Sequence, residues 1–134
     1  MRGDEVVAPV GKLIGFRPMS VEPGKAVFEL EAGPQHANPM GTLHGGVLCD
    51  VADAAMGVAY ASTLAEGESF TTLELKINFL RPFRTGTLIA TGRVVKTGRT
   101  IGVAECDVTD SDGRLIARAM STCMTLRGES SEGR

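Results

Sequence analysis

The sequence predicts an α+β domain in which a curved antiparallel β-sheet wraps around one long buried helix. Residues 47–63 lack proline, are rich in alanine and are apolar around most of the helical circumference. Strand-like segments flank this window, two before it and four after it, and short connectors join them. One flat sheet would cover only one face of such a helix, so we expect the sheet to curl around it.

Length and composition indicate a single domain spanning residues 1–134, with no repeat or internal linker. We expect flexible termini at residues 1–10 and 128–134, the second of which has no apolar residue to anchor it. The net charge is −2 and the basic residues are dispersed, which argues against nucleic acid as a partner. No window is apolar for long enough to cross a membrane and no secretory signal is evident, so we expect a cytoplasmic protein.

The segment before the helix predicts a hairpin and then a loop. Residues 11–30 alternate loosely between apolar and polar side chains, and Pro23 and Gly24 interrupt them near the middle. Residues 33–46 contain too many glycines and prolines for regular structure. We therefore expect two strands followed by an ordered lead-in to the helix.

The segment after the helix predicts four strands, at residues 70–80, 86–96, 101–109 and 115–126. Residues 81–86 break the first pair, residues 97–100 suit a tight hairpin, and Asp112-Gly113 tolerates the positive φ of a turn. Consecutive strands with short turns predict an antiparallel meander.

The helix carries a carboxylate, Asp53, among apolar neighbours. Burying an ionised carboxylate costs free energy unless it has a partner, so a structural or chemical role is expected. Gly45 and Gly46 precede it at the start of the helix, where unblocked N–H groups and the positive end of the helix dipole could stabilise an oxyanion. The glycines could equally serve only to turn the chain, and the local sequence leaves both interpretations open.

The three cysteines, Cys49, Cys106 and Cys123, are interpreted as buried free thiols, because their number is odd and no pair has metal-binding spacing. A nucleophilic Cys49 near the start of the helix is the alternative. Asp50 is assigned a structural role, in favourable interaction with the helix dipole.

The motif pattern resembles the hotdog-fold acyl-CoA thioesterases over residues 11–126. Within that superfamily it is most similar to the branch of the phenylacetate-pathway thioesterase and thioesterase superfamily member two, and it shares the layout of the Arthrobacter-type 4-hydroxybenzoyl-CoA thioesterase. The residues that carry the resemblance are Asn38, Gly41, His44-Gly45-Gly46, Asp53, Ala54, Gly57 and Ala59, followed by residues 71–82, which end in Arg81-Pro82.

The resemblance implies hydrolysis of an acyl-CoA to a free acid and CoA, with Asp53 as general base or nucleophile. The Gly45 N–H would polarise the carbonyl, Asn38 would hold the water or carboxylate, and His44 would support the turn. Thr72, or Thr71 if the alignment slips by one residue, would hydrogen-bond the water or carboxylate. Further contacts with the substrate are implied for Gly46, Arg81, Arg99 and Thr100.

The spacing of the motif also predicts an oligomer. His44 and Asp53 are nine positions apart, about 13 Å along a helix, which is too far for both to reach one thioester carbon. The resemblance places such sites at a dimer interface, and it implies a tetramer as a dimer of dimers. No cofactor is expected because the thioester is already activated, and the two histidines form no metal-binding cluster.

Two other functions are alternatives to hydrolysis. A non-catalytic acyl-CoA-binding or sensor protein with the same fold is the main alternative. A hotdog hydratase is less favoured, because such enzymes pair an Asp with a later His and no histidine follows Asp53. The acyl group itself is not specified, although an apolar slot could be lined by Met40, Leu43, Met56, Tyr60, Phe79 and Phe83.

Overall fold

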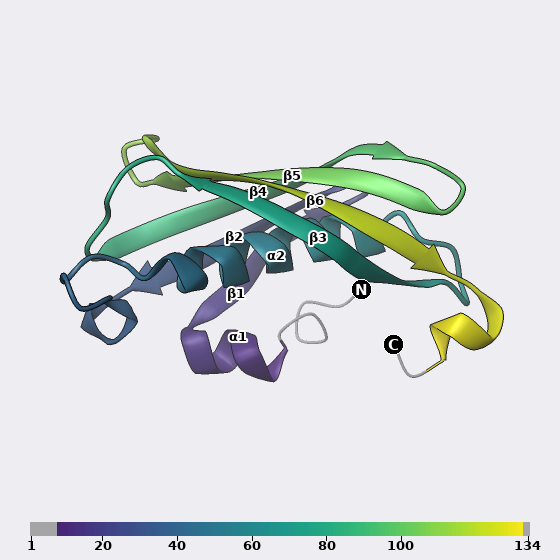
Figure 1. Ribbon diagram of the computed structural model, residues 1–134, viewed down its shortest axis with the longest axis horizontal. Helices are drawn as coiled ribbons and strands as arrows, with labels where there is room; N and C mark the ends of the chain where they lie inside the picture. The colour runs from purple at the N-terminus through teal and green to yellow at the C-terminus, as the bar shows by residue number, and fades with distance from the viewer. Residues whose placement is uncertain (1–7, 133–134) are drawn as a thin grey trace.

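The computed structural model describes residues 8–132 and shows the expected combination of one antiparallel sheet and one long helix. The sheet arches over helix α2, and the short helix α1 lies on the side of α2 that faces away from the sheet (Figure 1). The strands are β1 (Phe16–Glu22), β2 (Lys25–Ala32), β3 (Ser69–Phe79), β4 (Gly86–Thr97), β5 (Ile101–Asp110) and β6 (Leu115–Leu126). The helical elements are α1 (Pro9–Ile14), η2 (Pro34–His36), α2 (Gly45–Ala61) and η3 (Gly128–Ser131).

The sheet has the order β1-β2-β4-β5-β6-β3, and every neighbouring pair is antiparallel. The hairpin of β1 and β2 and the meander of β4, β5 and β6 confirm the sequence prediction. The prediction that β3 continues into this meander is wrong, because β3 pairs with β6 at the far edge. Leu80 and Arg81 continue that pairing by donating their N–H groups to the Ile116 carbonyl at 2.9 and 3.2 Å. Residues 80–85 then carry the chain to the middle of the sheet, a step that a tight hairpin cannot make.

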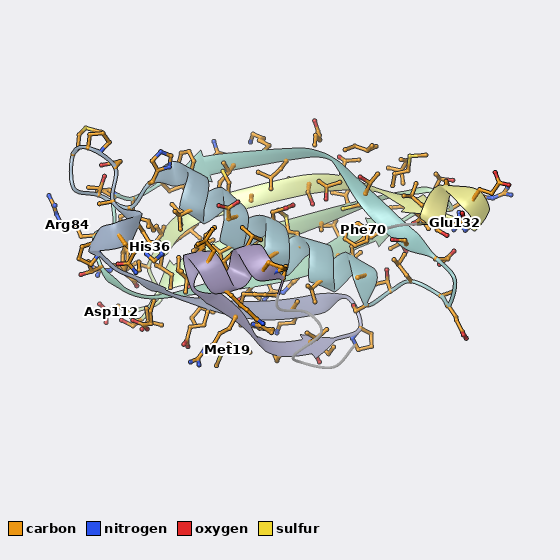
Figure 2. The ribbon with its side chains drawn as sticks, turned by 90° about the horizontal axis from the view of Figure 1, so that it is seen from below. Met19, His36, Phe70, Arg84, Asp112 and Glu132 are labelled. Carbon is orange, nitrogen blue, oxygen red and sulfur yellow. The ribbon has the colours of Figure 1, made fainter. Side chains whose placement is uncertain are left out.

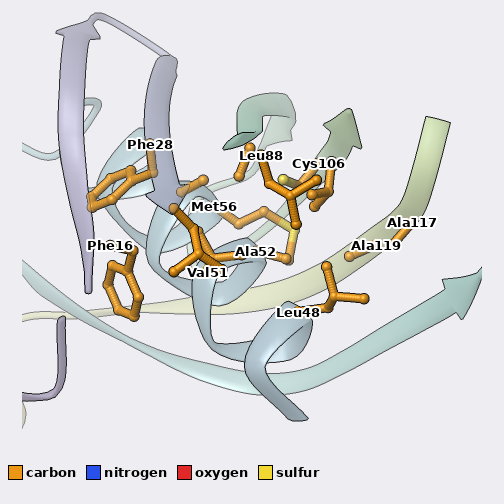
Figure 3. Packing of buried hydrophobic residues seen from close by; sticks show 14 of the residues in the cluster. Phe16, Phe28, Leu48, Val51, Ala52, Met56, Leu88, Cys106, Ala117 and Ala119 are labelled. Carbon is orange, nitrogen blue, oxygen red and sulfur yellow. The ribbon is translucent and has the colours of Figure 1, made fainter. Parts of the chain in front are cut away.

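Helix α2 packs one face against the concave side of the sheet. Val51, Met56 and Leu88 meet in the core between the two layers (Figure 3). The contact with β4 is closest at Gly92, where a Cβ atom would lie 2.5 Å from the Ala55 carbonyl oxygen, so a larger residue would push the helix away. The sheet does not cover the opposite face of α2, which lines a cavity instead.

Helix α1 differs from the sequence prediction, which divided its residues between the flexible terminus 1–10 and the loosely alternating segment 11–30. Pro9 occupies the first turn and Gly15 ends the helix with a φ of 103°, the usual arrangement of proline at the start and glycine at the end. The C-terminal end is held by His36, whose Nε2 lies 2.6 Å from the Ile14 carbonyl oxygen. The proline and the glycine are the two sequence signals that could have predicted this helix.

Two short elements occupy parts of the segments predicted as flexible termini. Pro9 and Val10 open α1, and Gly128–Ser131 forms η3. The start of η3 is held by Arg127, whose Nε donates to Glu68 at 2.6 Å. Residues 1–7 and 133–134, for which flexibility was also predicted, lie outside the described residues.

Candidate active site

The N-terminus of α2 is organised by His44, which is the N-cap residue. Its Nδ1 accepts the Gly46 N–H at 2.9 Å, and its own backbone N–H donates to the His36 carbonyl at 2.9 Å. The Gly46 donor is therefore already used. Among residues 8–132, the Gly45 N–H has no hydrogen-bond partner, so Gly45 is the donor available to a ligand at the positive end of the helix dipole.

Asn38 holds the loop that leads into this turn. Its Oδ1 accepts the N–H groups of Met40 at 2.9 Å and Thr42 at 3.1 Å, while its Nδ2 donates to the Thr42 hydroxyl at 2.8 Å. One amide hydrogen of Asn38 is left over from this network. The role implied for Asn38, holding a water or a carboxylate, would have to use that hydrogen.

Asn38 and Gly45 line one cavity of about 360 Å³, which we call the Gly45 cavity. Its other lining residues are Thr42, Leu43, Leu48, Phe79, Leu80, Arg81, Pro82 and Phe83. The ring of Phe79 packs directly on Gly45, because a Cβ atom there would lie 2.8 Å from the Phe79 Cζ. Any larger residue at this position would therefore have to displace the Phe79 ring.

Asp53 lies on the open face of α2 and lines a second cavity of about 300 Å³, which we call the Asp53 cavity. Thr72 lines it too, whereas Thr71 does not, which favours Thr72 of the two alternatives. The rest of the lining is Ala8, Val10, Phe16, Asp50, Ala54, Gly57, Val58, Ala61 and Phe70. A shallower groove lies beside it toward β3, lined by Cys49, Asp50, Asp53, Thr72, Leu73, Glu74 and Leu75.

Burial raises the pKa of the Asp53 carboxyl above its ordinary value, and the negative charge of Asp50 raises it further. Asp53 is an exposed residue, which corrects the expectation that it is buried among its apolar neighbours. The protein around the carboxylate removes only part of its hydration shell. A raised pKa makes a carboxylate a stronger base near neutral pH, which is the direction that general-base catalysis needs.

Asp50 has a different place from the one expected. It lies beyond the first turn of α2, which holds no acidic residue, so it does not interact with the helix dipole as proposed. It lines the same cavity and the same groove as Asp53 instead. The spacing of three residues between the two carboxylates, which puts them on one helix face, was the sequence signal that could have revealed this.

The two halves of the site do not meet within one subunit. The Gly45 cavity and the Asp53 cavity share no lining residue. Gly45 and Asp53 are eight positions apart on α2, about 12 Å along the helix axis. The separation expected from the spacing of the motif is therefore present in the structure.

The residues expected to contact CoA are divided between the two ends of the sheet. Arg81 lines the Gly45 cavity. Arg99 and Thr100 lie in the β4–β5 hairpin at the other end of the strands, where their carbonyl oxygens accept hydrogen bonds from Arg127 and from the Thr125 N–H. One subunit does not bring Arg99 and Thr100 to the Gly45 cavity.

The predicted apolar slot is only partly correct. Met56 and Tyr60 are fully buried against the sheet, since they lie on the packed face of α2, and Met40 is 80% exposed. Leu43, Phe79 and Phe83 do line the Gly45 cavity. The apolar wall beside Asp53 was missed, because part of it comes from α1, which the sequence did not predict.

The surroundings of the three cysteines do not favour a catalytic role. Cys106 and Cys123 are buried and free, and burial raises the pKa of Cys106 to about 12. Cys49 is half-buried, and burial together with the charges of Asp50 and Asp53 raises its pKa, which disfavours a nucleophilic thiolate.

The buried His36 accepts the Gly33 N–H at 3.0 Å in addition to holding α1. Within residues 8–132, no three His, Cys, Asp or Glu side chains gather into a group that could hold a metal ion. In the same part of the chain, no helix has the length and apolarity of a membrane span.

Known proteins share this fold and this sequence pattern. The family model of the thioesterase superfamily matches residues 40–117. The chain is 33% identical to 1,4-dihydroxy-2-naphthoyl-CoA hydrolase of Listeria monocytogenes, over 81% of this chain and 89% of that protein. It is 30% identical to human acyl-coenzyme A thioesterase 13, over 78% and 75% of the two chains. The structure of the E. coli PaaI protein from the phenylacetic acid degradation operon aligns with a TM-score of 0.84 and 28% identity, covering 90% of this chain and 86% of that one.

The chain therefore belongs to the thioesterase superfamily, because the family model spans more than half of its length. This confirms the predicted family, the hotdog fold and the enzyme class, a thioester hydrolase.

Proposed function

We propose that this protein hydrolyses acyl-CoA thioesters to a free carboxylic acid and CoA, in active sites shared by two subunits. The observation that carries the proposal is the presence of two complementary half-sites on one helix. At the N-terminus of α2, the Gly45 N–H has no hydrogen-bond partner within residues 8–132. On the open face of the same helix, Asp53 lies beside Thr72 in a largely apolar cavity. Hydrolysis of a thioester needs a hydrogen-bond donor for the developing oxyanion and also a general base or a nucleophile.

The chemistry of these groups can be written for either role of Asp53. The Gly45 N–H and the α2 dipole would stabilise the negative charge that develops on the carbonyl oxygen. As a general base, Asp53 would accept a proton from a water whose oxygen attacks the carbonyl carbon, and the C–S bond then breaks to release CoA. As a nucleophile, Asp53 would displace CoA and form a mixed anhydride, which water then hydrolyses. Thr72 lines the same cavity as Asp53, and its hydroxyl would hydrogen-bond either the water or the carboxylate.

A homodimer would bring the halves together, and the two edges of the sheet indicate where it forms. The β1 edge is interrupted by Pro18 and by a bulge before Ser20. The β3 edge is 11 residues long and has no proline. It carries one bulge, between Thr72 and Glu74, and Leu73 within this bulge is 54% exposed. A long edge that lacks proline and exposes an apolar side chain is the better pairing surface of the two. We therefore propose that β3 lies at the interface and that Asp53 faces Gly45 of the partner subunit.

The acyl-CoA class is supported by the relatives and by charge. The Listeria and human relatives are named as enzymes of CoA thioesters. Arg81 supplies a cation at the rim of the Gly45 cavity, suited to a phosphate of CoA. Arg99 and Thr100 would contact CoA only from another subunit. The tetramer and the cytoplasmic location stay predictions.

The test is release of free thiol from a panel of phenylacetyl-, hydroxybenzoyl- and straight-chain acyl-CoAs, with wild-type protein and Asp53→Asn. We expect turnover by the wild type and a loss of about 10²–10⁴-fold in kcat for Asp53→Asn, in a protein that stays folded. Full hydrolysis by Asp53→Asn would overturn the assigned role of Asp53. Binding of acyl-CoA without thiol release by the wild type would favour the non-catalytic sensor instead.

A further inference from the structure

The Asp53 cavity is elongated along α2. Asp53 and Thr72 line its polar end, and Ala61 and Phe70 line its apolar end. Asp53 and Ala61 are eight positions apart on α2, so the cavity extends about 12 Å beyond the carboxylate. The Phe70 ring is held in place by packing on Tyr60, with the ring centroids 5.4 Å apart.

Helix α1 forms the wall of this cavity on the side away from the sheet. Figure 2 shows α1 crossing over α2, with Phe70 labelled on β3 beyond it. Helix α1 is anchored from its middle to its C-terminal end, by the close packing of Gly11 on the Phe16 ring and by the contact of His36 with the Ile14 carbonyl. Ala8 and Val10, at the other end, stand over the open face of α2 and line the cavity.

Gly57 leaves space in the opposite wall, one helical turn beyond Asp53. Glycine inside a helix costs about 1 kcal/mol relative to alanine, yet it occupies the interior of the 17-residue α2. A Cβ atom at Gly57 would lie 3.4 Å from the Phe70 ring, in ordinary contact and with no backbone clash. A methyl group at this position would therefore fit without a clash and would take up space in the cavity beside Phe70.

We propose that the Asp53 cavity holds the acyl group, and that Gly57 and Val10 set the length of acyl chain that the enzyme accepts. The assignment rests on the proposed function. The Gly45 cavity carries Arg81, whereas the lining beyond Asp53 is apolar and suits a hydrocarbon chain. A cavity of about 300 Å³ has roughly twice the volume of an engineered 150 Å³ cavity that binds benzene. We therefore assign as the accepted class a straight chain of medium length or an aryl group of similar volume.

The experiment measures kcat/KM for straight-chain acyl-CoAs from acetyl to palmitoyl, in wild-type protein, Gly57→Val and Val10→Ala. Gly57→Val should lower the ratio of octanoyl-CoA to butanoyl-CoA turnover by about tenfold or more, the usual effect of lost room in an apolar pocket. Val10→Ala should move the preference toward longer chains. Leu13→Ala is the matched control, since Leu13 lies on the same helix but is 85% exposed and does not line the cavity.

Opposite shifts in the two cavity variants, with no shift in Leu13→Ala, would support the assignment. An unchanged chain-length profile in both would overturn it, as would the same shift in all three variants. Gly57→Ala tests whether a loss comes from misfolding, because alanine should keep or raise helix stability while still narrowing the cavity.

Calorimetric binding of the same acyl-CoAs to Asp53→Asn separates this inference from the proposed function. One outcome is that the wild type releases no thiol while Gly57→Val, added to Asp53→Asn, shortens the longest acyl chain that binds. In that case the acyl assignment holds and the hydrolytic function fails. If thiol is released and neither turnover nor binding responds to Gly57 or Val10, only the acyl assignment fails.

Discussion

The Gly45 half and the Asp53 half of the candidate site differ in how completely one subunit builds them. The Gly45 turn is held by the His44 cap, by the Asn38 loop and by the Leu43 N–H, which donates to the Phe83 carbonyl at 2.7 Å. Asp53 has no hydrogen-bond or ion-pair partner within residues 8–132. The comparison teaches that the donor is preorganised by local structure, whereas the carboxylate faces a place that the same subunit leaves open.

The largest expected effect comes from mixing two variants that each break one half. Asp53→Asn and Gly45→Val should both be nearly inactive alone, the second because its side chain displaces Phe79 and blocks the donor. Unfolding and refolding an equal mixture should restore about a quarter of wild-type sites, since half of the randomly paired dimers carry one intact shared site. The measurement is thiol release by the mixture against each variant alone. A mixture no more active than its components would mean that each subunit builds its own site.

Loss of the His44 cap should weaken the preorganised half. His44→Ala removes the acceptor of the Gly46 N–H and should lower the free energy of unfolding by about 1 kcal/mol, with a fall in kcat. Chemical denaturation and steady-state kinetics measure the two effects. His44→Asp restores an N-cap acceptor and should recover the stability. Equal stability of the alanine and aspartate variants would contradict the capping role.

The Asp53 half should be adjustable through Asp50. Burial is the main cause of the raised pKa of Asp53 and Asp50 the second, so Asp50→Asn should lower that pKa only part of the way. Because a general base works in its deprotonated form, the acidic limb of the kcat profile should move to lower pH while the plateau stays the same. Glu74→Gln, which changes a carboxylate in the neighbouring groove, is the control and should leave the limb in place. An acidic limb at the same pH in Asp50→Asn and in the wild type would show that Asp50 does not affect the pKa of Asp53.

The same raised pKa has a consequence for stability. The folded protein binds the Asp53 proton more tightly than the unfolded chain does. The contribution of this proton to the free energy of unfolding is therefore fully present below the ordinary carboxyl pKa. It is lost as pH rises through the raised pKa. Asp53→Asn should therefore flatten this part of the pH dependence of the unfolding free energy, measured by denaturant titration. The opposite slope would show that the carboxylate gains a favourable partner on folding.

The smallest effect is expected at Cys49, which borders both carboxylates without a role in either half. Cys49→Ala should leave kcat unchanged, because the raised pKa keeps the thiol protonated at neutral pH. The assay is steady-state hydrolysis of the best substrate of the panel. A large loss of kcat with normal folding would revive the nucleophilic cysteine.

Local patterns in the sequence predicted a large part of the fold. The predicted bounds of β6 agree with the structure, and the Pro23-Gly24 and Asp112-Gly113 turns occur where expected. These features depend on neighbouring residues, through alternation and turn conformations. The edge position of β3 could not be read in this way, because it depends on pairing with β6, about fifty residues away at Thr72 and Cys123.

The sequence by itself determined the family pattern, the long helix and the distance between the half-sites. Helical rise converts the spacing of Gly45 and Asp53 directly into a separation that no folding can shorten. Only the tertiary structure decided which face of α2 is open. It also decided that Asp50 and Thr72 line the same cavity as Asp53 and that residues of α1 form one wall of this cavity. Those facts arise from packing between elements that are distant in sequence, and residue order alone does not specify which side chains such packing leaves facing a cavity.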